Sequence, residues 1–262
     1  MFTNRKSYFV NRTSYPYLFY RMLHPVFYYI FAQLLIGAVG MGIANRKADT
    51  LTKRQRWLKF FTYILIVGFV LSAILLHWFW CVAPLIVVIG GVELLRAILH
   101  SQQRVALPIA LLIVTGYVFV SGSFVVFAWV SAQSFLLFIY FQVITFDGFS
   151  QVCGQLAGKQ ALLPAVSPNK TVEGLAGGML FTLLATALAR HWIAASLLQV
   201  LLLALGTGGS ALAGDLLASY LKRLTYIKDY SNLLPGHGGV LDRFDSLLMT
   251  GAFYYWVHAV FG

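Results

Sequence analysis

The sequence predicts an all-α membrane protein, a polytopic transmembrane helical bundle of about eight spans with two polar loops. Sixty per cent of the 262 residues are hydrophobic and only 10% are charged, whereas ordinary soluble domains carry roughly 25% charged residues. Apolar runs recur along the chain at about the 17–25 residues that cross a bilayer as a helix. No repeat or soluble domain is evident, so we expect a single membrane domain.

Eight apolar stretches are expected to form the spans. In chain order they cover 25–45, 60–79, 80–99, 106–122, 123–146, 174–189, 192–221 and 244–261. The first is longer than a typical signal-peptide core and has no small-x-small cleavage pattern, so we expect a retained anchor. The stretch 192–221 contains Gly206, Gly208 and Gly209, and because glycines relax helix geometry we expect a broken or strongly tilted helix.

Three regions follow from this pattern. Residues 1–24 mix aromatic and basic side chains, which is typical of a segment that lies in the membrane interface. Residues 25–146 hold the N-terminal transmembrane helices. Residues 147–262 contain the polar loops 147–173 and 222–243, and we expect this region to be catalytic.

The net charge of +11 comes mostly from lysines and arginines in short segments between apolar runs, such as Arg46-Lys47. Such loop cations face the cytoplasm in membrane proteins. A hairpin turning at Arg190-His191 puts both polar loops on one membrane face, and the basic loop 46–59 falls there too. We therefore expect that face to be cytoplasmic, and we expect no nucleic-acid partner because no binding motif is present.

Two sets of residues indicate structure rather than chemistry. Cys81 and Cys153 are isolated from each other, so neither a disulfide nor a metal site follows from them. Glu93 and Arg96 lie three residues apart near the end of a predicted span, and we expect them to pair across one helical turn.

Asp215, Ser219, Lys222 and Arg223 form the first polar cluster. Offsets of four, seven and eight residues place all four on one helical face. The two cations alone fit a helix end whose side chains reach lipid headgroups. A carboxylate after a long apolar run is costly without a partner, so Asp215 indicates a site.

A glycine-rich run follows, Gly236-His237-Gly238-Gly239, with Asp242 and Asp245 directly after it. Its backbone is able to approach a ligand closely and donate N–H bonds to phosphate. A tight loop without a ligand would show the same glycine pattern. Asp242 alone fits an ordinary helix N-cap. A helix cap would explain Asp242 but not the additional carboxylate of Asp245, nor the presence of Asp229 and Asp215 nearby in sequence.

Carboxylates and a hydroxyl are the hard oxygen ligands that Mg²⁺ prefers, with positions left for substrate phosphates. Lysine and arginine beside such an ion neutralise the charge that develops on phosphate during transfer. The combination predicts Mg²⁺-dependent phosphoryl or nucleotidyl transfer.

The upstream loop supports two interpretations equally. Ser167-Pro168 resembles an N-cap followed by proline at the first helical position. A hydroxyl and Lys170 at a helix N-terminus would equally form an anion site. Gly154 and Gly158, four residues apart, fit close helix packing as well as a functional role.

Together, two runs resemble the signatures of phosphatidate cytidylyltransferases (CDP-diacylglycerol synthases), covering roughly residues 145–250. The downstream run is Ser219-x2-Lys222-Arg223-x4-Lys228-Asp229-x5-Pro235-Gly236-His237-Gly238-Gly239-x2-Asp242-Arg243-x-Asp245. The upstream run contains Asp147, Gly154, Gly158-Lys159 and Ser167-Pro-x-Lys170-Thr171-x-Glu173-Gly174. Phe146, Gln155 and Val172 stand where the family often has Asn, Arg and Trp, which affects the choice of lipid more than the reaction.

The resemblance implies transfer of CMP from CTP to phosphatidic acid, giving CDP-diacylglycerol and pyrophosphate in phospholipid biosynthesis. It implies Mg²⁺, with a second cation possible, held by Asp215 and Asp242, and catalysis assisted by Lys222 and Arg223. Positions implied to face the nucleotide or its phosphates are Ser167, Lys170, Ser219, Lys228, His237, Gly238 and Gly239. Acidic positions that match the motifs with less defined roles are Asp147, Asp229 and Asp245.

Other functions remain open at this point. A polyprenol kinase or an ether-lipid cytidylyltransferase would use CTP in a similar membrane site. A transporter would scatter its acidic residues through several spans, and a non-catalytic paralogue would have lost the motif residues. The family resemblance favours a bacterial inner membrane, and the sequence leaves a homodimer open.

Overall fold

The computed structural model of the chain describes residues 28–39, 42, 45–46, 49–101, 105–190, 196–234, 236 and 238–261. Within these ranges the protein is almost entirely helical, as the composition predicts. The predicted interfacial segment 1–24 lies outside the described residues.

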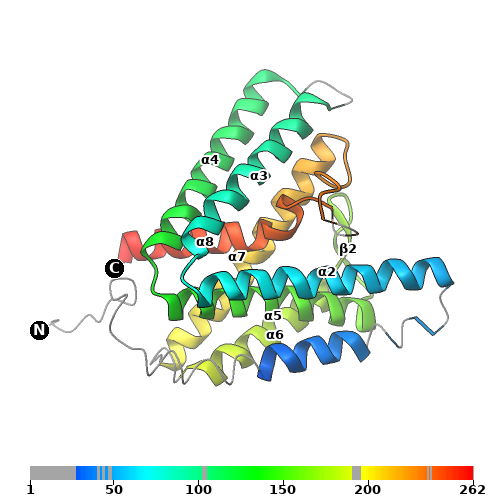
Figure 1. Cartoon of the computed structure of the whole chain (residues 1–262), viewed down its shortest axis with the longest axis vertical. Helices are drawn as coiled ribbons and strands as arrows, with labels where there is room; N and C mark the ends of the chain where they lie inside the picture. The colour runs from blue at the N-terminus through cyan, green and yellow to red at the C-terminus, as the bar shows by residue number, and fades with distance from the viewer. Residues whose placement is uncertain are drawn as a thin grey trace, which may run out of the picture.

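Eight helices fill the described ranges (Figure 1). A short apolar helix, Tyr28–Val39, is followed by α2 (Thr50–Leu75), α3 (Phe79–Leu99), α4 (Leu107–Val130), α5 (Gln133–Ala157), α6 (Val172–Ala189), α7 (Leu197–Leu224) and α8 (Leu241–Phe261). Of the helices in this part of the chain, six, α2 to α7, are long and apolar enough to cross a membrane. The eight predicted stretches therefore correspond to helices, and six of these are candidate spans.

Two predicted helix boundaries are wrong. The break expected between 106–122 and 123–146 lies instead at residues 131–132, where α4 ends and α5 begins. The polar residues near position 122 stay inside α4 because their hydroxyls bond to the preceding turn, as Ser123 Oγ does to the Phe119 carbonyl at 2.8 Å. Of the two forms expected for the stretch 192–221, the broken helix is also wrong, since α7 is continuous through Gly206–Gly209. The strong tilt stays a prediction.

The predicted loop 147–173 is instead mostly helix and strand. Helix α5 continues to Ala157, so Asp147 is helical. A short antiparallel hairpin follows, with β1 (Ala161–Leu163) paired to β2 (Ser167–Thr171). Helix α6 then starts at Val172, with the Thr171 side chain accepting a bond from the Gly174 N–H at 3.0 Å.

Helix α5 is the most buried of the six candidate spans, and it contacts α2, α6, α7 and α8. Its closest contact is with α6, where Gly154 lies against Gly174. A Cβ atom on Gly174 would lie 2.7 Å from the Ser150 carbonyl oxygen and 3.2 Å from the Gly154 Cα. Gly154 therefore serves close helix packing, one of the two roles its spacing allowed.

We expect Gly174→Ala to destabilise the protein by about 1–3 kcal/mol, because the added methyl group collides with backbone atoms that have little room to move. Thermal unfolding in detergent would measure the change. Gly116→Ala in α4 is the matched control, since a Cβ there meets nothing within 4 Å. A Gly174→Ala protein as stable as the Gly116→Ala protein would contradict the close α5–α6 contact.

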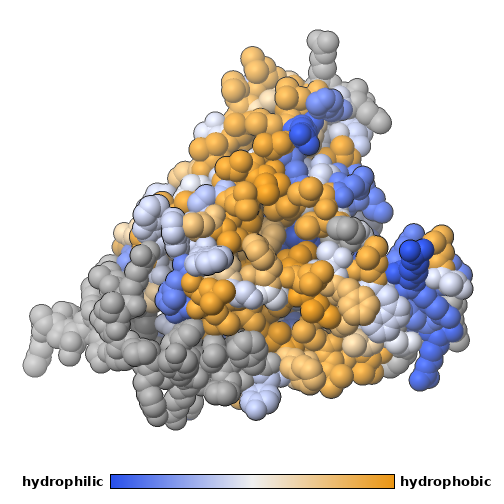
Figure 2. Space-filling model, viewed as in Figure 1, coloured by the Kyte–Doolittle hydropathy of each residue, from blue (hydrophilic) through white to orange (hydrophobic). Residues whose placement is uncertain are grey.

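The polar ends of the helices gather on one side of the molecule. In Figure 1 the start of α2, the β hairpin, the end of α7 and the start of α8 lie toward the right of the view. Figure 2 shows the most hydrophilic residues on that side and hydrophobic residues across the middle. The two predicted polar loops therefore meet at one end of the bundle, as expected.

Candidate active site

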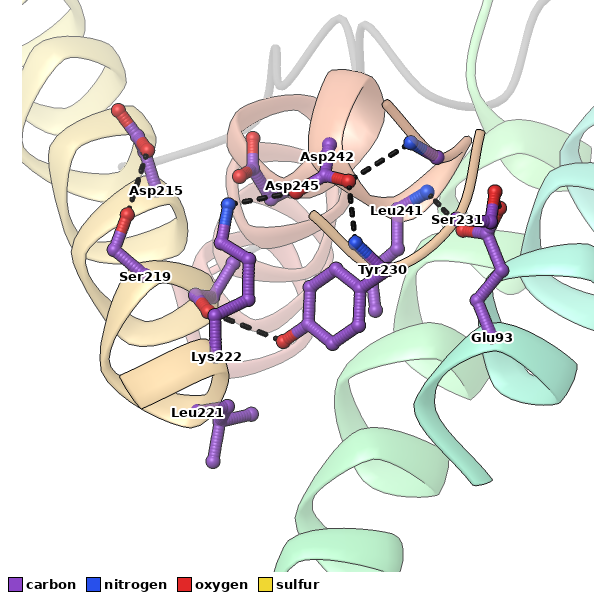
Figure 3. Close-up of polar contacts among 12 residues, drawn as sticks. Glu93, Asp215, Ser219, Leu221, Lys222, Tyr230, Ser231, Leu241, Asp242 and Asp245 are labelled. Atoms are coloured by element: carbon purple, nitrogen blue, oxygen red, sulfur yellow. Dashed lines mark hydrogen bonds and ion pairs between the residues drawn. The ribbon is translucent and has the colours of Figure 1, made fainter. Parts of the chain in front are cut away.

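Helix α7 carries the first part of the site, on the face predicted from the spacing of its polar residues. Ser219, which is 8% exposed, donates a long hydrogen bond of 3.5 Å to Asp215 Oδ1 (Figure 3). The other carboxylate oxygen of Asp215 forms an ion pair with Lys170 Nζ from β2. Arg223 departs from this group, because its Nε donates to the Val166 carbonyl of the hairpin at 3.3 Å.

Asp242 lies in the first turn of α8 and forms the second ion pair. Its Oδ1 is 2.6 Å from Lys222 Nζ, and the carboxylate side chain is only 2% exposed. Its Oδ2 accepts bonds from the Tyr230 and Gly239 backbone N–H groups, both at 2.8 Å (Figure 3). Asp242 is therefore both a cap for the preceding turn and the partner of a catalytic lysine candidate.

Close contact between α7 and α8 depends on Gly214. A Cβ atom on this residue would collide with the Asp245 carbonyl oxygen and lie 2.8 Å from the Met249 Cβ. The absent side chain brings the helix that carries Asp215 and Lys222 directly against the helix that carries Asp242.

The glycines of the turn before α8 have separate roles. Gly238 has a φ of +84°, which favours glycine, and its carbonyl accepts the Leu234 N–H at 2.9 Å in an isolated β-bridge. A Cβ on Gly238 would lie 2.8 Å from Asp242 Oδ2, and one on Gly239 would lie 2.6 Å from Glu93 Oε2. The turn is therefore glycine-rich because carboxylates approach its backbone closely. His237 lies outside the described residues.

Glu93 is a site residue that the sequence reasoning assigned to the wrong partner. The predicted pairing with Arg96 is absent. Glu93 accepts bonds from Ser231 Oγ at 2.6 Å, Val240 N at 3.0 Å and Leu241 N at 2.8 Å (Figure 3). The one available signal was an isolated acidic residue within an otherwise apolar span.

The hairpin brings Lys170 into the site, but not in the predicted way. Ser167 opens a β-strand, and α6 begins five residues after it, so Ser167 does not take the N-cap position that one of its two interpretations gave it. Thr171 takes the capping position, and Glu173 in the first turn accepts the Lys159 and Gln160 N–H groups at 3.0 and 3.3 Å. At this helix N-terminus the Gly174 N–H bonds to the Thr171 side chain and the Val172 N–H bonds to the Gln160 carbonyl at 2.9 Å. Lys170 contacts Asp215 from the strand.

Asp147 and Asp245 approach the same region from α5 and α8. Ser246 connects them, since its Oγ donates to Asp147 Oδ1 at 3.3 Å and its N–H donates to Asp245 Oδ1 at 2.7 Å. Burial lowers the pKa of the Lys170 ammonium, and the Asp147 and Asp245 carboxylates oppose that shift. Lys170 therefore faces three carboxylates from three helices, including Asp215.

The remaining predicted residues lie at the margin. Lys228 and Asp229 are exposed on the turn after α7, with the Asp229 side chain next to Gly238. Ser167 lies at the far end of β2 from Lys170. Cys81 is exposed and Cys153 is partly buried, and both are free thiols.

Comparison with known proteins decides the family. The sequence profile of the cytidylyltransferase family matches residues 17–261 of this chain. The chain belongs to the cytidylyltransferase family. Its helical bundle and its polar end are thus those of a family whose members are enzymes.

Relatives of this chain include proteins with more specific names. It is 42% identical over 119 residues to the phosphatidate cytidylyltransferase of Bacillus subtilis, a match that covers 44% of each chain. It is 28% identical over 215 residues to the Rickettsia bellii protein of the same name, covering 76% of this chain and 88% of that one. It is also 42% identical over 106 residues to the uncharacterized Escherichia coli protein YnbB, covering 40% and 36%.

Asp215 and Asp242 supply carboxylate oxygens, the ligand type that Mg²⁺ prefers. Asp215 and Asp242 each lie against a lysine ammonium, so both carboxylates already stabilise a cation. In the described ranges no group of three or more His, Cys, Asp or Glu side chains is placed to hold a metal alone. Mg²⁺ usually takes one or two protein carboxylates and completes its shell with water and substrate phosphates, so Asp215 and Asp242 are the residues that would hold it.

Proposed function

We propose that this cytidylyltransferase is a Mg²⁺-dependent phosphatidate cytidylyltransferase, which transfers CMP from CTP to phosphatidic acid and releases pyrophosphate. The observation that carries the proposal is the pair of ion pairs Lys170–Asp215 and Lys222–Asp242 at the polar end of the bundle. Acids from α7 and α8 and lysines from β2 and α7 meet where a nucleotide from water is able to reach a lipid headgroup. The names of the Bacillus and Rickettsia relatives support this choice of lipid.

In the proposed reaction a phosphate oxygen of phosphatidic acid attacks the α-phosphorus of CTP, and pyrophosphate leaves. A phosphate monoester is largely ionised at pH 7, since its second pKa is about 6, so no strong general base is needed. Lys170 and Lys222 neutralise phosphate charge as it develops, and Ser219 orients Asp215. A Mg²⁺ held by Asp215 and Asp242 would supply further charge neutralisation at the triphosphate.

Positioning is expected to provide most of the remaining rate, as in other phosphoryl transfers. The glycine turn and Tyr230 hold Asp242 through backbone N–H groups. Five further residues are proposed to contact the nucleotide: Ser167, Arg223, Lys228, Asp229 and His237. Asp147 and Asp245 are proposed to keep Lys170 charged.

The proposed orientation places the site in the cytoplasm of a bacterial cell. Among the residues that the structure describes, most lysines and arginines lie at the polar end, whereas Arg190 lies at the opposite end of the spans. Cytoplasmic loops carry such an excess of cations. The acids come from several helices, but they gather at this one end together with Lys170 and Lys222, which supports phosphate chemistry over a transport pathway across the bilayer.

Product analysis of the purified protein in mixed micelles tests the function. With phosphatidic acid, Mg²⁺ and CTP labelled at the α-phosphate, we expect labelled CDP-diacylglycerol that disappears on chelation. With CTP labelled at the γ-phosphate, we expect the label in pyrophosphate. Label from the γ-phosphate in the lipid would identify a kinase, and reaction only with an ether lipid would change the substrate. Absence of any labelled lipid would overturn the proposal.

A further inference from the structure

Glu93 is a buried carboxylate that the proposed reaction does not use. It lies on α3, outside both sequence motifs, and is 3% exposed. A buried charge is costly unless hydrogen bonds compensate it. Its partners are therefore a guide to its role, and they lie 138 to 148 residues away in sequence.

Two of these partners belong to the start of α8. The N–H groups of Val240 and Leu241 are among those that a helix leaves without an intrahelical acceptor at its first turn. Glu93 accepts from both, at 3.0 and 2.8 Å. A negative charge at this position also stabilises the helix dipole. Glu93 thus caps α8 from a different helix.

The third partner fixes the turn before α8. Ser231 donates to Glu93 Oε1 at 2.6 Å and in turn accepts the Leu233 N–H at 3.2 Å. On its other side the same turn donates to Asp242 through Gly239. The 231–241 turn is therefore held between two carboxylates, one from α3 and one from α8 (Figure 3).

We propose that Glu93 is a positioning residue for this active site: it anchors the 231–241 turn and the first turn of α8 to α3, and so keeps Asp242 beside Lys222. The proposal rests on the proposed function for its catalytic consequence. Asp242 directly follows Leu241, whose N–H Glu93 binds. A shift of this turn would move the carboxylate that is proposed to hold Mg²⁺.

Glu93→Gln tests the proposal, because the amide keeps the shape but replaces one acceptor oxygen with a donor. Loss of a group that orients a metal ligand typically reduces metal affinity or activity about 10- to 100-fold. We therefore expect the half-saturating Mg²⁺ concentration for CMP transfer to rise about tenfold, together with a lower kcat. Ser231→Ala leaves both backbone N–H bonds to Glu93 in place, so we expect a smaller change.

Hydrogen–deuterium exchange of the peptide 229–245 gives a readout that needs no activity. We expect faster exchange in Glu93→Gln, and about tenfold more Mg²⁺ alone to slow it. Asp49→Asn is the matched control, because it makes the same chemical change at an exposed helix cap that accepts the Thr52 N–H at 3.1 Å. We expect this control to behave as wild type in both measurements.

Two results would overturn the inference. Glu93→Gln with wild-type exchange would show that the contact does not hold the turn. Faster exchange with an unchanged Mg²⁺ requirement would show that Glu93 supports the fold only. A wild-type protein that makes no CDP-diacylglycerol would overturn the proposed function instead. The Mg²⁺-dependent hydrogen–deuterium exchange would still decide the role of Glu93.

Discussion

Asp242→Asn is expected to lower the rate of Mg²⁺-dependent CMP transfer by at least about a hundredfold. The substitution removes the charge that faces Lys222 and one of the two acceptor oxygens that bind backbone N–H groups and the lysine. Loss of a metal-holding carboxylate costs several kcal/mol of transition-state stabilisation, and each 1.4 kcal/mol is about a factor of ten in rate. Initial rates over a range of Mg²⁺ concentrations would measure it.

The folded state of this variant has to be shown separately. Size-exclusion chromatography and thermal unfolding in detergent would show whether Asp242→Asn inserts and folds. The Asp49→Asn protein again supplies the same chemical change away from the site. A purified Asp242→Asn protein with wild-type activity would rule out the proposed metal role.

Lys222→Met is expected to reduce both stability and activity. It leaves the Asp242 carboxylate, which is 2% exposed, without its ionic partner. Removing one member of a buried ion pair typically destabilises a protein by about 3–5 kcal/mol, because the other charge stays buried. Thermal unfolding and the rate of CMP transfer would be measured on the same preparation.

A second variant at this position separates charge from geometry, and a variant on α2 is the control. Lys222→Arg keeps the charge, so we expect it to recover much of the stability but less of the activity. Arg54→Met removes one exposed cation from α2 and is expected to leave both properties unchanged. Equal stability of Lys222→Met and wild type would contradict a buried Lys222–Asp242 pair.

The helical bundle could be predicted from the sequence because the length of each apolar run depends only on the local composition. The errors of this prediction arose where polar residues stay inside helices. The break predicted between residues 122 and 123 falls beside Ser121 and Ser123, whose hydroxyls each bond to a carbonyl of their own helix. The glycines of α7 indicated a break as well, whereas Gly206 and Gly208 provide room for Phe253 and Met179.

The α7 part of the site was also predictable, since helical spacing fixed Asp215, Ser219 and Lys222 on one face. Of the two interpretations of Ser167, the N-cap is wrong, because Ser-Pro before a helix gives the same pattern whether the serine or a later threonine is the cap. Its proposed contact with the nucleotide stays a prediction. Glu93 was misassigned because a nearby arginine offered a local partner. Its real partners are brought near only by the packing of α3 against α8, which no local pattern specifies.

The paired lysines have a consequence for which anions the site accepts. Because Lys170 and Lys222 are each already compensated by an aspartate, an approaching polyanion meets little net attraction and several carboxylates that repel it. A triphosphate that arrives with its divalent counterion carries less negative charge and brings the cation those carboxylates would otherwise lack. If the proposed function holds, charge complementarity therefore favours the metal-complexed nucleotide over free nucleotides and other soluble phosphates at the moment of encounter.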